Sequence, residues 1–513
     1  MKRYIKYTAG FSIVLSLFSS CKKFVESDPR GQFTQENYYR NQAEVFNGLV
    51  AAYDPLGFQG GDYVTKVSAM SAGSDDNLAG GGGSSDFVPL QAISNYSLIP
   101  ANGPQDALWK GGFLGVYRVN ILLSKIDAAT MPDDIRLRYK AELKALRAYY
   151  YFDLVRLFKN IPLMLTPVDP KDAYNILQVA PEVVYAQIEK DLKEAIAEDK
   201  LPNTVPKATE AGRMTKGIAH ALLGKVYLYE KKFTEAATEL ALVNGVPGQM
   251  NSVYGYKLLD DFAALWKTAN KFNTESILEI AHTSKGNGGW SCIECTEGNL
   301  LNIMLAPRAY TGLLPGAPDY ISGYGALIVT KNFFDFIHFD PRNKASVANL
   351  DSLKKAGIAK YDNSYENTGF FVEKFAGRAS DKSTGGGPSE LNYPQNTYEI
   401  RLADTYLLEA EALVRGGGDL SRARALIAAV RNRAYKDGAD HSVDATLDNI
   451  ITERRLELAF EGHRWFDLIR WGKAGTVLAF KGFITGKHEI LPIPLKELEN
   501  TQLVQSKEWG GTK

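Results

Sequence analysis

Two glycine-rich stretches carry side chains suited to binding hydroxyl groups. The first, from Gly57 to Gly103, contains the run Ser74-Asp75-Asp76-Asn77, and the second, from Tyr254 to Pro394, is rich in glycine, proline and aromatic residues. The C–H faces of sugar rings stack on Trp and Tyr, and sugar hydroxyls pair with carboxylates, amides and guanidinium groups. The two stretches therefore predict a carbohydrate-binding surface with these candidate residues: Asp75, Asp76, Asn77, Trp290, Tyr320, Tyr324 and, as an additional candidate, Arg378.

The glycines themselves do not predict a phosphate-binding loop. Gly80 to Gly83 is an unbroken run, but G-x-x-x-x-G-K-[ST] is absent, and Ser85 occupies the last glycine position of the one near match to G-x-G-x-x-G. The run indicates a loop, because consecutive glycines are unfavourable inside helices and strands. The preceding Asp-Asp-Asn run is then either a solvated turn or part of a ligand-binding loop.

Two of the cysteines predict one short disulfide, given the export that the N-terminus predicts. Cys292 and Cys295 form a C-x-x-C pair, and a pair of thiols outside the cytoplasm is expected to oxidise. A zinc site is not expected, because no second C-x-x-C and no suitably spaced histidine pair is present. A thioredoxin-like role is not expected either, because the pair lacks a βαβ setting.

The sequence shows no catalytic motif. It contains neither H-E-x-x-H nor a G-x-S-x-G elbow, and its six histidines are scattered: His220, His282, His338, His441, His463 and His488. We therefore predict that the protein is not an enzyme and uses neither metal nor cofactor. A glycoside hydrolase stays an alternative, because the spatial separation of two carboxylates cannot be read from sequence.

The N-terminus predicts export and a lipid anchor. Lys2, Arg3 and Lys6 precede the apolar run Phe11–Phe18, which is too short to span a bilayer and is typical of a signal peptide. The following Ser19-Ser20-Cys21 resembles a lipoprotein lipobox, which implies acylation of Cys21 and anchoring in a membrane. We therefore predict a signal peptide over 1–20 and a tether over 21–33. An ordinary secretory signal is the alternative.

Composition excludes nucleic acid as a partner. The 513-residue chain contains 59 Lys and Arg and 59 Asp and Glu, so its formal charge is zero and it lacks the basic surface that nucleic-acid binding requires. The length predicts either two lobes or an elongated helical array.

The remainder of the chain is predominantly helical in pattern. Leu223-Gly224, Tyr227 and Ala236 fall at the offsets of a tetratricopeptide helix pair, and residues 405–434 predict a second pair that turns at Gly416–Gly418. The apolar stripe of residues 136–158 places Tyr149, Tyr150 and Tyr151 in the core. Helices are expected over residues 34–54, 109–126, 136–158, 180–198, 214–243, 405–434 and 448–471.

The last of these helices has an unusual charge pattern. Residues 448–471 predict one long helix that is capped by Asp448 and ends before Gly472, with Glu453, Glu457 and Glu461 repeating every four residues. Like charges at this spacing repel one another. At three-residue spacing Arg454, Arg464 and Arg470 are expected to pair with Glu457, Glu461 and Asp467, respectively. We expect basic side chains from neighbouring elements to neutralise the rest. A solvated amphipathic helix is the alternative.

Several segments also carry a resemblance to a known family. ERRLELAFEGHRWFDLIRWG (453–472) is similar to a signature of the SusD/RagB family of bacterial outer-membrane nutrient-binding lipoproteins, and further similarity lies in ALRAYYYFDLVRLFKNIPL (145–163), RLADTYLLEAEAL (401–413) and LPIPLKELENTQLVQ (491–505). Lys159-Asn160 stands where the family commonly has a single glycine. The resemblance implies a lipid-anchored protein on the outer membrane that faces the cell exterior and acts as a lid on a SusC-like TonB-dependent transporter.

The resemblance and the residue patterns predict one architecture. The fold is expected to be mainly α, a SusD-like α-solenoid with tetratricopeptide-like helix pairs and an irregular, loop-rich ligand region with few short strands. Within a domain over 34–513, helical parts are expected at 34–253, with a loop insert at 57–103, and at 395–513, and the loop-rich part at 254–394. The predicted function is oligosaccharide capture and delivery to the transporter. A peptide-binding relative of the same fold is the alternative.

Overall fold

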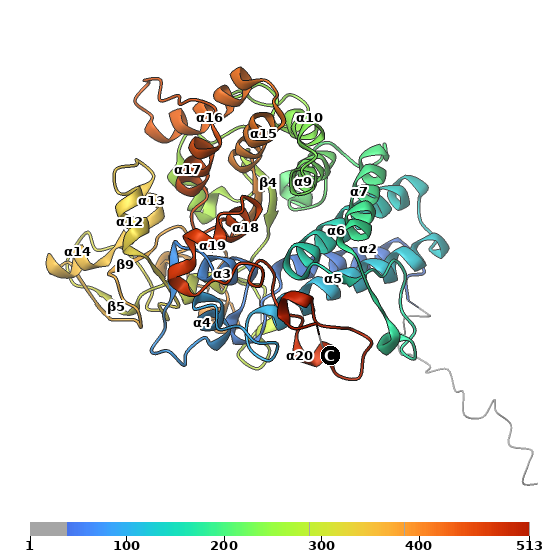
Figure 1. Cartoon of the computed structure of the whole chain (residues 1–513), viewed down its shortest axis with the longest axis horizontal. Helices are drawn as coiled ribbons and strands as arrows, with labels where there is room; N and C mark the ends of the chain where they lie inside the picture. Colours follow the sequence, from blue (N-terminus) through green and yellow to red (C-terminus); the bar gives the residue numbers. More distant parts are fainter. Residues whose placement is uncertain (1–37, 287, 384, 512–513) are drawn as a thin grey trace, which may run out of the picture.

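The computed structural model describes residues 38–511 apart from 287 and 384. The predicted signal peptide, Cys21 and the tether lie outside the described residues. A curved array of helices forms one side of the molecule, and a region of short strands and loops forms the other (Figure 1). Within the described residues, no helix combines the length and the apolar character needed to cross a membrane.

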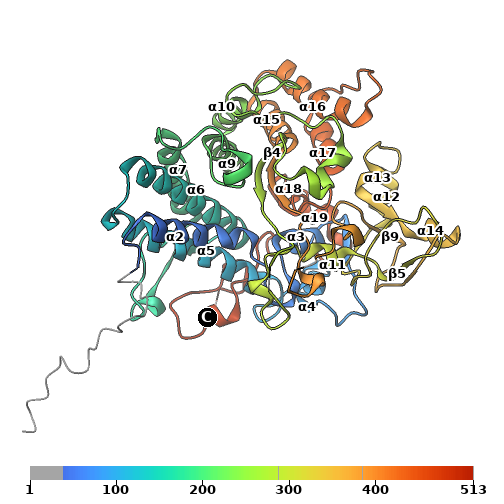
Figure 2. The same ribbon diagram turned by 180° about the vertical axis from the view of Figure 1, so that it is seen from behind.

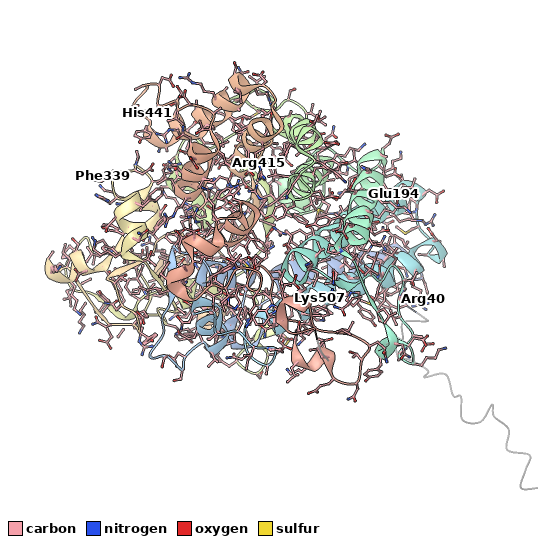
Figure 3. The ribbon with its side chains drawn as sticks, viewed as in Figure 1. Arg40, Glu194, Phe339, Arg415, His441 and Lys507 are labelled. Carbon is pink, nitrogen blue, oxygen red and sulfur yellow. A yellow bond between two sulfur atoms is a disulfide. The ribbon has the colours of Figure 1, made fainter. Side chains whose placement is uncertain are left out.

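The helical array is a solenoid in which each helix packs on the next. The packed pairs run from α5–α6 through α7, α9, α10 and α15 to α16 and α17, and Glu194 on α7 and Arg415 on α15 mark two of these helices in Figure 3. The helices are α2 (Gln42–Tyr53), α5 (Gln105–Lys125), α6 (Asp133–Phe158), α7 (Pro181–Ala197), α9 (Lys216–Tyr229), α10 (Phe233–Asn244), α15 (Leu402–Gly416), α16 (Leu420–Tyr435) and α17 (Leu447–Glu457).

The two predicted helix pairs are present, α9 with α10 and α15 with α16. A Cβ atom on Gly224 would lie 2.6 Å from Cγ of Leu240, so only glycine lets α9 and α10 approach this closely. Gly417 adopts φ 70° at the end of α15, a left-handed conformation that favours glycine and turns the chain into α16. The mainly helical architecture with tetratricopeptide-like helix pairs, predicted from the sequence, is therefore confirmed.

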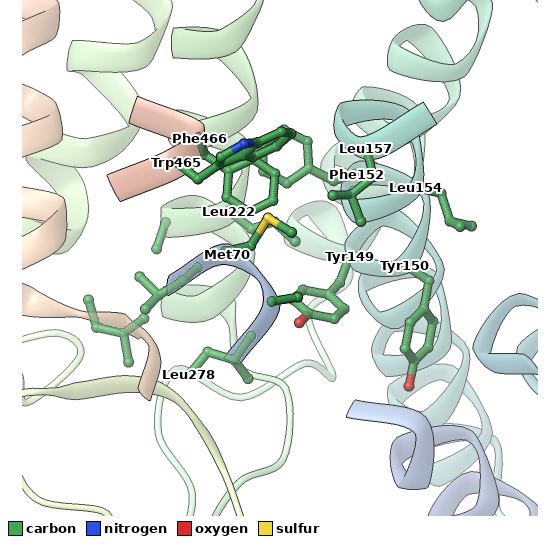
Figure 4. Packing of buried hydrophobic residues seen from close by; sticks show 14 of the residues in the cluster. Met70, Tyr149, Tyr150, Phe152, Leu154, Leu157, Leu222, Leu278, Trp465 and Phe466 are labelled. Carbon is green, nitrogen blue, oxygen red and sulfur yellow. The ribbon is translucent and has the colours of Figure 1, made fainter. Parts of the chain in front are cut away.

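The core lies where the solenoid meets the rest of the chain. Tyr149, Tyr150 and Tyr151 are buried, as predicted, and Tyr150 donates a hydrogen bond to the carbonyl of Ala52 (2.7 Å). Figure 4 shows Met70 lying near both Tyr149 and the fully buried Trp465. The first glycine-rich stretch therefore contributes directly to the core.

The first glycine-rich stretch is more ordered than predicted. It contains α3 (Lys66–Ala72), β1 (Asn77–Ala79) and α4 (Val88–Ser94), and β1 pairs antiparallel with β6 (Leu327–Val329) of the loop-rich region. The four-stranded sheet so formed has the order β1-β6-β9-β7, with β9 at Phe370–Val372 and β7 at Val347–Asn349. The two regions predicted to bind ligand are therefore joined in one sheet, on the side of the molecule away from α7 (Figure 2).

The remaining regular elements are short. The strands are β2 (Ile161–Pro162) paired with β3 (Gln178–Val179), β4 (Ser276–Ile280) with β10 (Thr397–Arg401), and β5 (Arg308–Gly312) with β8 (Ala359–Asp362). The short helices are α8 (Lys207–Glu210), α11 (Leu301–Leu305), α12 (Lys331–Ile337), α13 (Asn343–Ser346), α14 (Leu350–Lys355), α18 (Arg464–Arg470), α19 (Ala474–Val477) and α20 (Leu495–Leu498).

The prediction of one helix over residues 448–471 is wrong. Helix α17 ends at Glu457, and α18 begins at Arg464. Phe460 (φ 67°) and Gly462 (φ 83°) are left-handed, so the helix cannot continue through them. The ring of Phe460 packs edge-on against Phe333, with centroids 4.9 Å apart, which holds the non-glycine residue in this conformation. The cap of α17 is Thr446 rather than Asp448, whereas Gly472 follows α18 as predicted.

The expectation that neighbouring basic groups neutralise the three glutamates is confirmed. All three are buried, and none is solvated. Glu453 pairs with Arg342 (2.6 Å), and Glu457 pairs with Arg342 (2.8 Å) and Arg401 (2.6 Å). Glu461 pairs with Arg401 (2.8 Å). Two arginines from different elements thus each bridge two of the glutamates.

Further basic groups complete this buried charge network. Arg433 of α16 pairs with Glu457, and Lys374 pairs with Glu461 at 2.8 Å. Burial by itself raises the pKa of Glu457, but Arg433, Arg401 and Arg342 outweigh that effect and hold the pKa well below its ordinary value. The glutamate is therefore ionised in the folded protein at neutral pH.

The partners predicted from spacing alone are only partly correct. Arg470 pairs with Asp467 (2.8 Å), as the three-residue spacing indicates. Arg454 pairs with Asp467 (2.8 Å) instead of Glu457, and Arg464 pairs with Asp75 (2.8 Å) instead of Glu461. The break between α17 and α18 is the reason, because it directs Arg454 towards Asp467 and Arg464 towards the first glycine-rich stretch.

Replacing Glu457 with Gln should destabilise the fold strongly. The substitution leaves Arg401 and Arg433 buried with one negative charge fewer, so we expect the unfolding free energy at pH 7 to fall by about 3–5 kcal/mol, measured by urea denaturation. As a control, Glu44→Gln removes the surface pair with Arg40 and should leave the unfolding midpoint unchanged.

The difference in stability between Glu457→Gln and wild type should decrease in acid. The pKa of Glu457 is lower in the folded chain than the unfolded value of 4.5, so its stabilising effect is complete above about pH 5 and is lost as pH falls towards the folded pKa. The difference in unfolding free energy between wild type and Glu457→Gln should therefore shrink from about pH 5 to about pH 3. A difference that stays constant over this interval would contradict the assignment.

Candidate ligand-binding site

Four aromatic rings from both glycine-rich stretches meet at the surface. Tyr63 and Phe87 come from the first stretch, and Trp290 and Tyr324 come from the second. The ring centroid of Tyr63 lies 5.7 Å from Phe87, 5.9 Å from Tyr324 and 6.4 Å from Trp290, and those of Phe87 and Tyr324 are 6.0 Å apart. Trp290 is 46% exposed. These four residues form what we call the aromatic cluster.

The backbone of the first stretch holds its two rings in unusual conformations. Tyr63 (φ 62°) and Phe87 (φ 50°) are both left-handed, a conformation that is costly for bulky side chains and is found most often at functional sites. Tyr63 closes a short 3-10 helix (Gly61–Tyr63), and Phe87 directly precedes α4. The backbone around Tyr63 and Phe87 therefore determines where their rings lie.

Hydrogen bonds fix the second stretch against the first. The amide of Gly80 donates to the carbonyl of Ala326, and the amide of Gly81 donates to that of Gly325, both at 2.8 Å. A Cβ atom on Gly80 would lie 2.2 Å from the carbonyl oxygen of Gly325, so glycine is required for this approach. These bonds extend the β1–β6 pairing and bring Tyr324 beside Phe87.

A disulfide stiffens the loop that carries Trp290. Cys292 and Cys295 are bonded, with Cα atoms 5.3 Å apart, around a 3-10 helix (Ile293–Cys295). Glu294, inside the ring, pairs with Lys110 of α5 (2.6 Å), so the closed loop is also attached to the solenoid. The tryptophan is thus presented two residues before a covalently closed turn.

The predicted contacts of Asp75, Asp76 and Asn77 with a ligand are corrected by the structure. All three side chains are buried, and Asp76 is only 1% exposed. Arg455 of α17 lies 2.8 Å from both aspartates. Because these carboxylates are enclosed by protein partners, they attach the first stretch to α17 and α18 and are not available to a ligand.

A buried lysine completes that attachment. Lys481 Nζ donates hydrogen bonds to the carbonyls of Ala72, Ser74 and Asn77 at 2.5, 2.8 and 2.8 Å. Burial lowers its pKa to about 7 even though Asp75 and Asp76 act to raise it. No local pattern predicts this contact, because more than 400 residues separate the partners.

Tyr320 and Arg378 lie together but apart from the aromatic cluster. The guanidinium carbon of Arg378 is 4.5 Å from the ring centroid of Tyr320, and both side chains contact Glu373. Arg378 lines a separate pocket of about 660 Å³, whose wall includes Trp266. The seven predicted binding residues thus divide into three groups, of which only Trp290 and Tyr324 contribute to the cluster.

Sequence reasoning missed Tyr63 and Phe87. Phe87 follows the run Gly80–Gly83 closely, and Tyr63 follows Gly60-Gly61, so an aromatic residue beside consecutive glycines was the available signal. Among residues 38–511 other than 287 and 384, no three His, Cys, Asp or Glu side chains are grouped as a metal site would require. The cluster itself is a surface of aromatic rings carried by backbone loops.

Comparison with known proteins identifies the family. The family model described as "SusD family" matches residues 349–509, and the model described as "Starch-binding associating with outer membrane" matches residues 83–228. A solved structure titled "Laminarin binding SusD-like protein" is 46% identical, covers 91% of this chain and 99% of its own, and superposes with a TM-score of 0.86. The chain belongs to the SusD family.

Other SusD-family relatives agree over most of the chain. Surface glycan-binding protein A from Bacteroides thetaiotaomicron, solved in complex with laminarihexaose, is 28% identical with a TM-score of 0.80 and covers 91% of this chain and 99% of its own. A SusD-like protein of Bacteroides ovatus is 25% identical, over 89% of this chain and 80% of its own length.

Opening the disulfide should loosen the Trp290 loop without unfolding the protein. In the chain-entropy model a ring this small contributes about 2 kcal/mol, so a variant with both Cys292→Ser and Cys295→Ser should exchange backbone amides over residues 288–297 about 30-fold faster. Hydrogen exchange with mass spectrometry measures this change. Strand β4 serves as the internal control and should exchange at an unchanged rate, and equal exchange of the loop in both proteins would contradict the stiffening role.

Proposed function

We propose that this protein captures oligosaccharides at the cell surface by stacking sugar rings on the aromatic cluster. The observation that carries the proposal is the meeting of four rings, with Trp290 46% exposed, where the two glycine-rich stretches join. Partly exposed aromatic rings on a rigid frame bind the C–H faces of sugars with little loss of side-chain freedom.

The relatives favour a laminarin-type oligosaccharide as the ligand. One relative is named for binding laminarin, and another was solved with laminarihexaose. Each of these two alignments covers 91% of this chain. We therefore choose laminarihexaose as the first ligand to test.

Membership of the SusD family supports delivery to a transporter. We infer that the protein lies on the outer membrane facing the exterior, anchored through acylated Cys21, and passes its ligand to a SusC-like TonB-dependent transporter. The family model named for association with the outer membrane supports this location. Nothing in the proposal requires catalysis, and the names of the relatives refer to binding.

Removing a ring from the cluster should weaken binding. We expect Trp290→Ala and Tyr324→Ala each to weaken laminarihexaose binding by about tenfold or more in isothermal titration calorimetry, because each deletes a stacking surface. Phe339→Ala is the matched control, since it removes an 85% exposed ring on the turn after α12 (Figure 3) and should leave the affinity unchanged.

Other results would refute the cluster or support one of the two alternatives. Retention of wild-type affinity in both cluster variants would refute the cluster as the binding site. Binding to a peptide library with no glycan bound on an array would favour a peptide-binding relative, whereas release of reducing sugars from laminarin by the pure protein would establish a hydrolase.

The proposed anchor is testable by labelling. Cys21→Ala removes the only thiol of the predicted lipobox, so the full-length variant expressed in a Bacteroides host should incorporate no labelled palmitate and should leave the outer-membrane fraction. Wild type should incorporate the label and remain with the membrane. Equal membrane association of both proteins, without label in either, would contradict the lipid anchor.

A further inference from the structure

A small polar notch lies beside the aromatic cluster. We define this notch by Gly82, Asp86 and Arg308. A Cβ atom placed on Gly82 would lie 2.9 Å from Oδ2 of Asp86 and 3.2 Å from both Nη1 and Nη2 of Arg308. The acid and the guanidinium thus lie on either side of the position that a side chain at residue 82 would take, and the glycine leaves the approach to both groups open.

The guanidinium of Arg308 is not used by the fold. Among the described residues it has no hydrogen-bond or ion-pair partner, although its side chain is half-buried. Arg455 and Arg464, by contrast, are both paired with aspartates. Because no protein group uses the N–H donors of Arg308, this guanidinium is free to bind a ligand that supplies acceptors.

Asp86 also faces the notch but does not pair with Arg308. Its Oδ2 accepts a hydrogen bond from the amide of Gly82 (2.6 Å), which fixes the orientation of the carboxylate, but no ion pair joins it to Arg308. A donor and an acceptor held near one point but not bonded to each other can be bridged by hydroxyl groups, because a hydroxyl both donates and accepts. A neutral diol suits this arrangement better than an anion, since the two charges balance.

The chain connects this notch to the rings of the aromatic cluster. A Cβ atom on Gly81 would lie 3.0 Å from Cδ2 of Phe87, and one on Gly325, the residue after Tyr324, would lie 3.4 Å from Cγ of Arg308. Gly81, which precedes Gly82, is therefore next to the ring of Phe87, and Gly325, which follows Tyr324, is next to Arg308. The notch and these two rings are therefore neighbouring parts of one surface.

We propose that the notch binds two adjacent hydroxyls of a glucopyranose unit whose ring is stacked on the aromatic cluster. Arg308 donates to the hydroxyl oxygens through its planar fork, Asp86 accepts from a hydroxyl, and the missing side chain of Gly82 provides the space. This inference rests on the proposed glycan-binding function. It adds a polar subsite that selects which edge of the sugar faces the protein.

Two neighbouring glycines provide a matched test. Neither Gly82 nor Gly83 has a positive φ, so alanine is compatible with the backbone at both. A Cβ atom on Gly82 fills the notch, whereas one on Gly83 meets nothing within 4 Å. We expect Gly82→Ala to weaken laminarihexaose binding about tenfold in calorimetry and Gly83→Ala to leave it within about twofold, because hydrogen bonds to charged groups are lost only in the first.

A second variant keeps the test valid if Gly82→Ala disturbs its loop. Arg308→Gln removes the charge and the fork from a side chain without internal partners, so the melting temperature should be unchanged while affinity falls about tenfold. The affinity of the double variant Gly82→Ala, Arg308→Gln should lie within about twofold of that of the weaker single variant, because both substitutions act on the same hydroxyls.

The outcomes separate this proposal from the function on which it rests. If Trp290→Ala abolishes binding while Gly82→Ala and Arg308→Gln bind as wild type does, the notch is wrong and the cluster stands. If wild type itself does not bind laminarihexaose, both proposals fail for this ligand. If Gly83→Ala weakens binding as much as Gly82→Ala, the effect belongs to the loop backbone and the notch is refuted.

Discussion

The structure depends on burying three glutamates in the segment that contains α17 and α18. Glu453, Glu457 and Glu461 would repel one another on an isolated helix, and isolated ionised carboxylates are very unfavourable in a protein interior. Their partners come from distant parts of the chain: Arg342 and Lys374 from the loop-rich region, Arg401 from β10 where it leads into α15, and Arg433 from the solenoid. Because each charge is compensated only when both regions are docked, the network couples the solenoid to the loops.

The opposite face of the same segment holds the first glycine-rich stretch. Arg455 and Arg464 pair with Asp75 and Asp76, and Lys481 binds the backbone carbonyls around them. The segment therefore positions both stretches at once, and the β1–β6 pairing brings their rings together. A binding surface assembled from two long loops requires such a frame, since loops that are free to move would lose much of their affinity in becoming ordered on binding.

Strained backbone and unused donors occur together at the aromatic cluster. Tyr63 and Phe87 adopt left-handed conformations, and within the described residues the guanidinium of Arg308 has no hydrogen-bond or ion-pair partner. Phe460 is also left-handed and is held by packing on Phe333, so the combination of strain with unused donors, and not strain alone, marks this surface. Their coincidence beside an exposed tryptophan distinguishes this surface from the pocket lined by Arg378 and Trp266.

The sequence by itself determined the helical scaffold, the helix pairs, the buried tyrosines and the need for basic partners around Glu457, because these follow from local periodicity, glycine placement and charge repulsion. It also indicated Trp290 and Tyr324 as aromatic residues of ordered loops. Only the tertiary structure decided that the helix breaks at Phe460, that Asp75 and Asp76 are structural, and that Tyr63 and Phe87 join the cluster. Those outcomes depend on contacts between residues hundreds of positions apart, such as Arg455 with Asp76, and on left-handed backbone that no local pattern specifies.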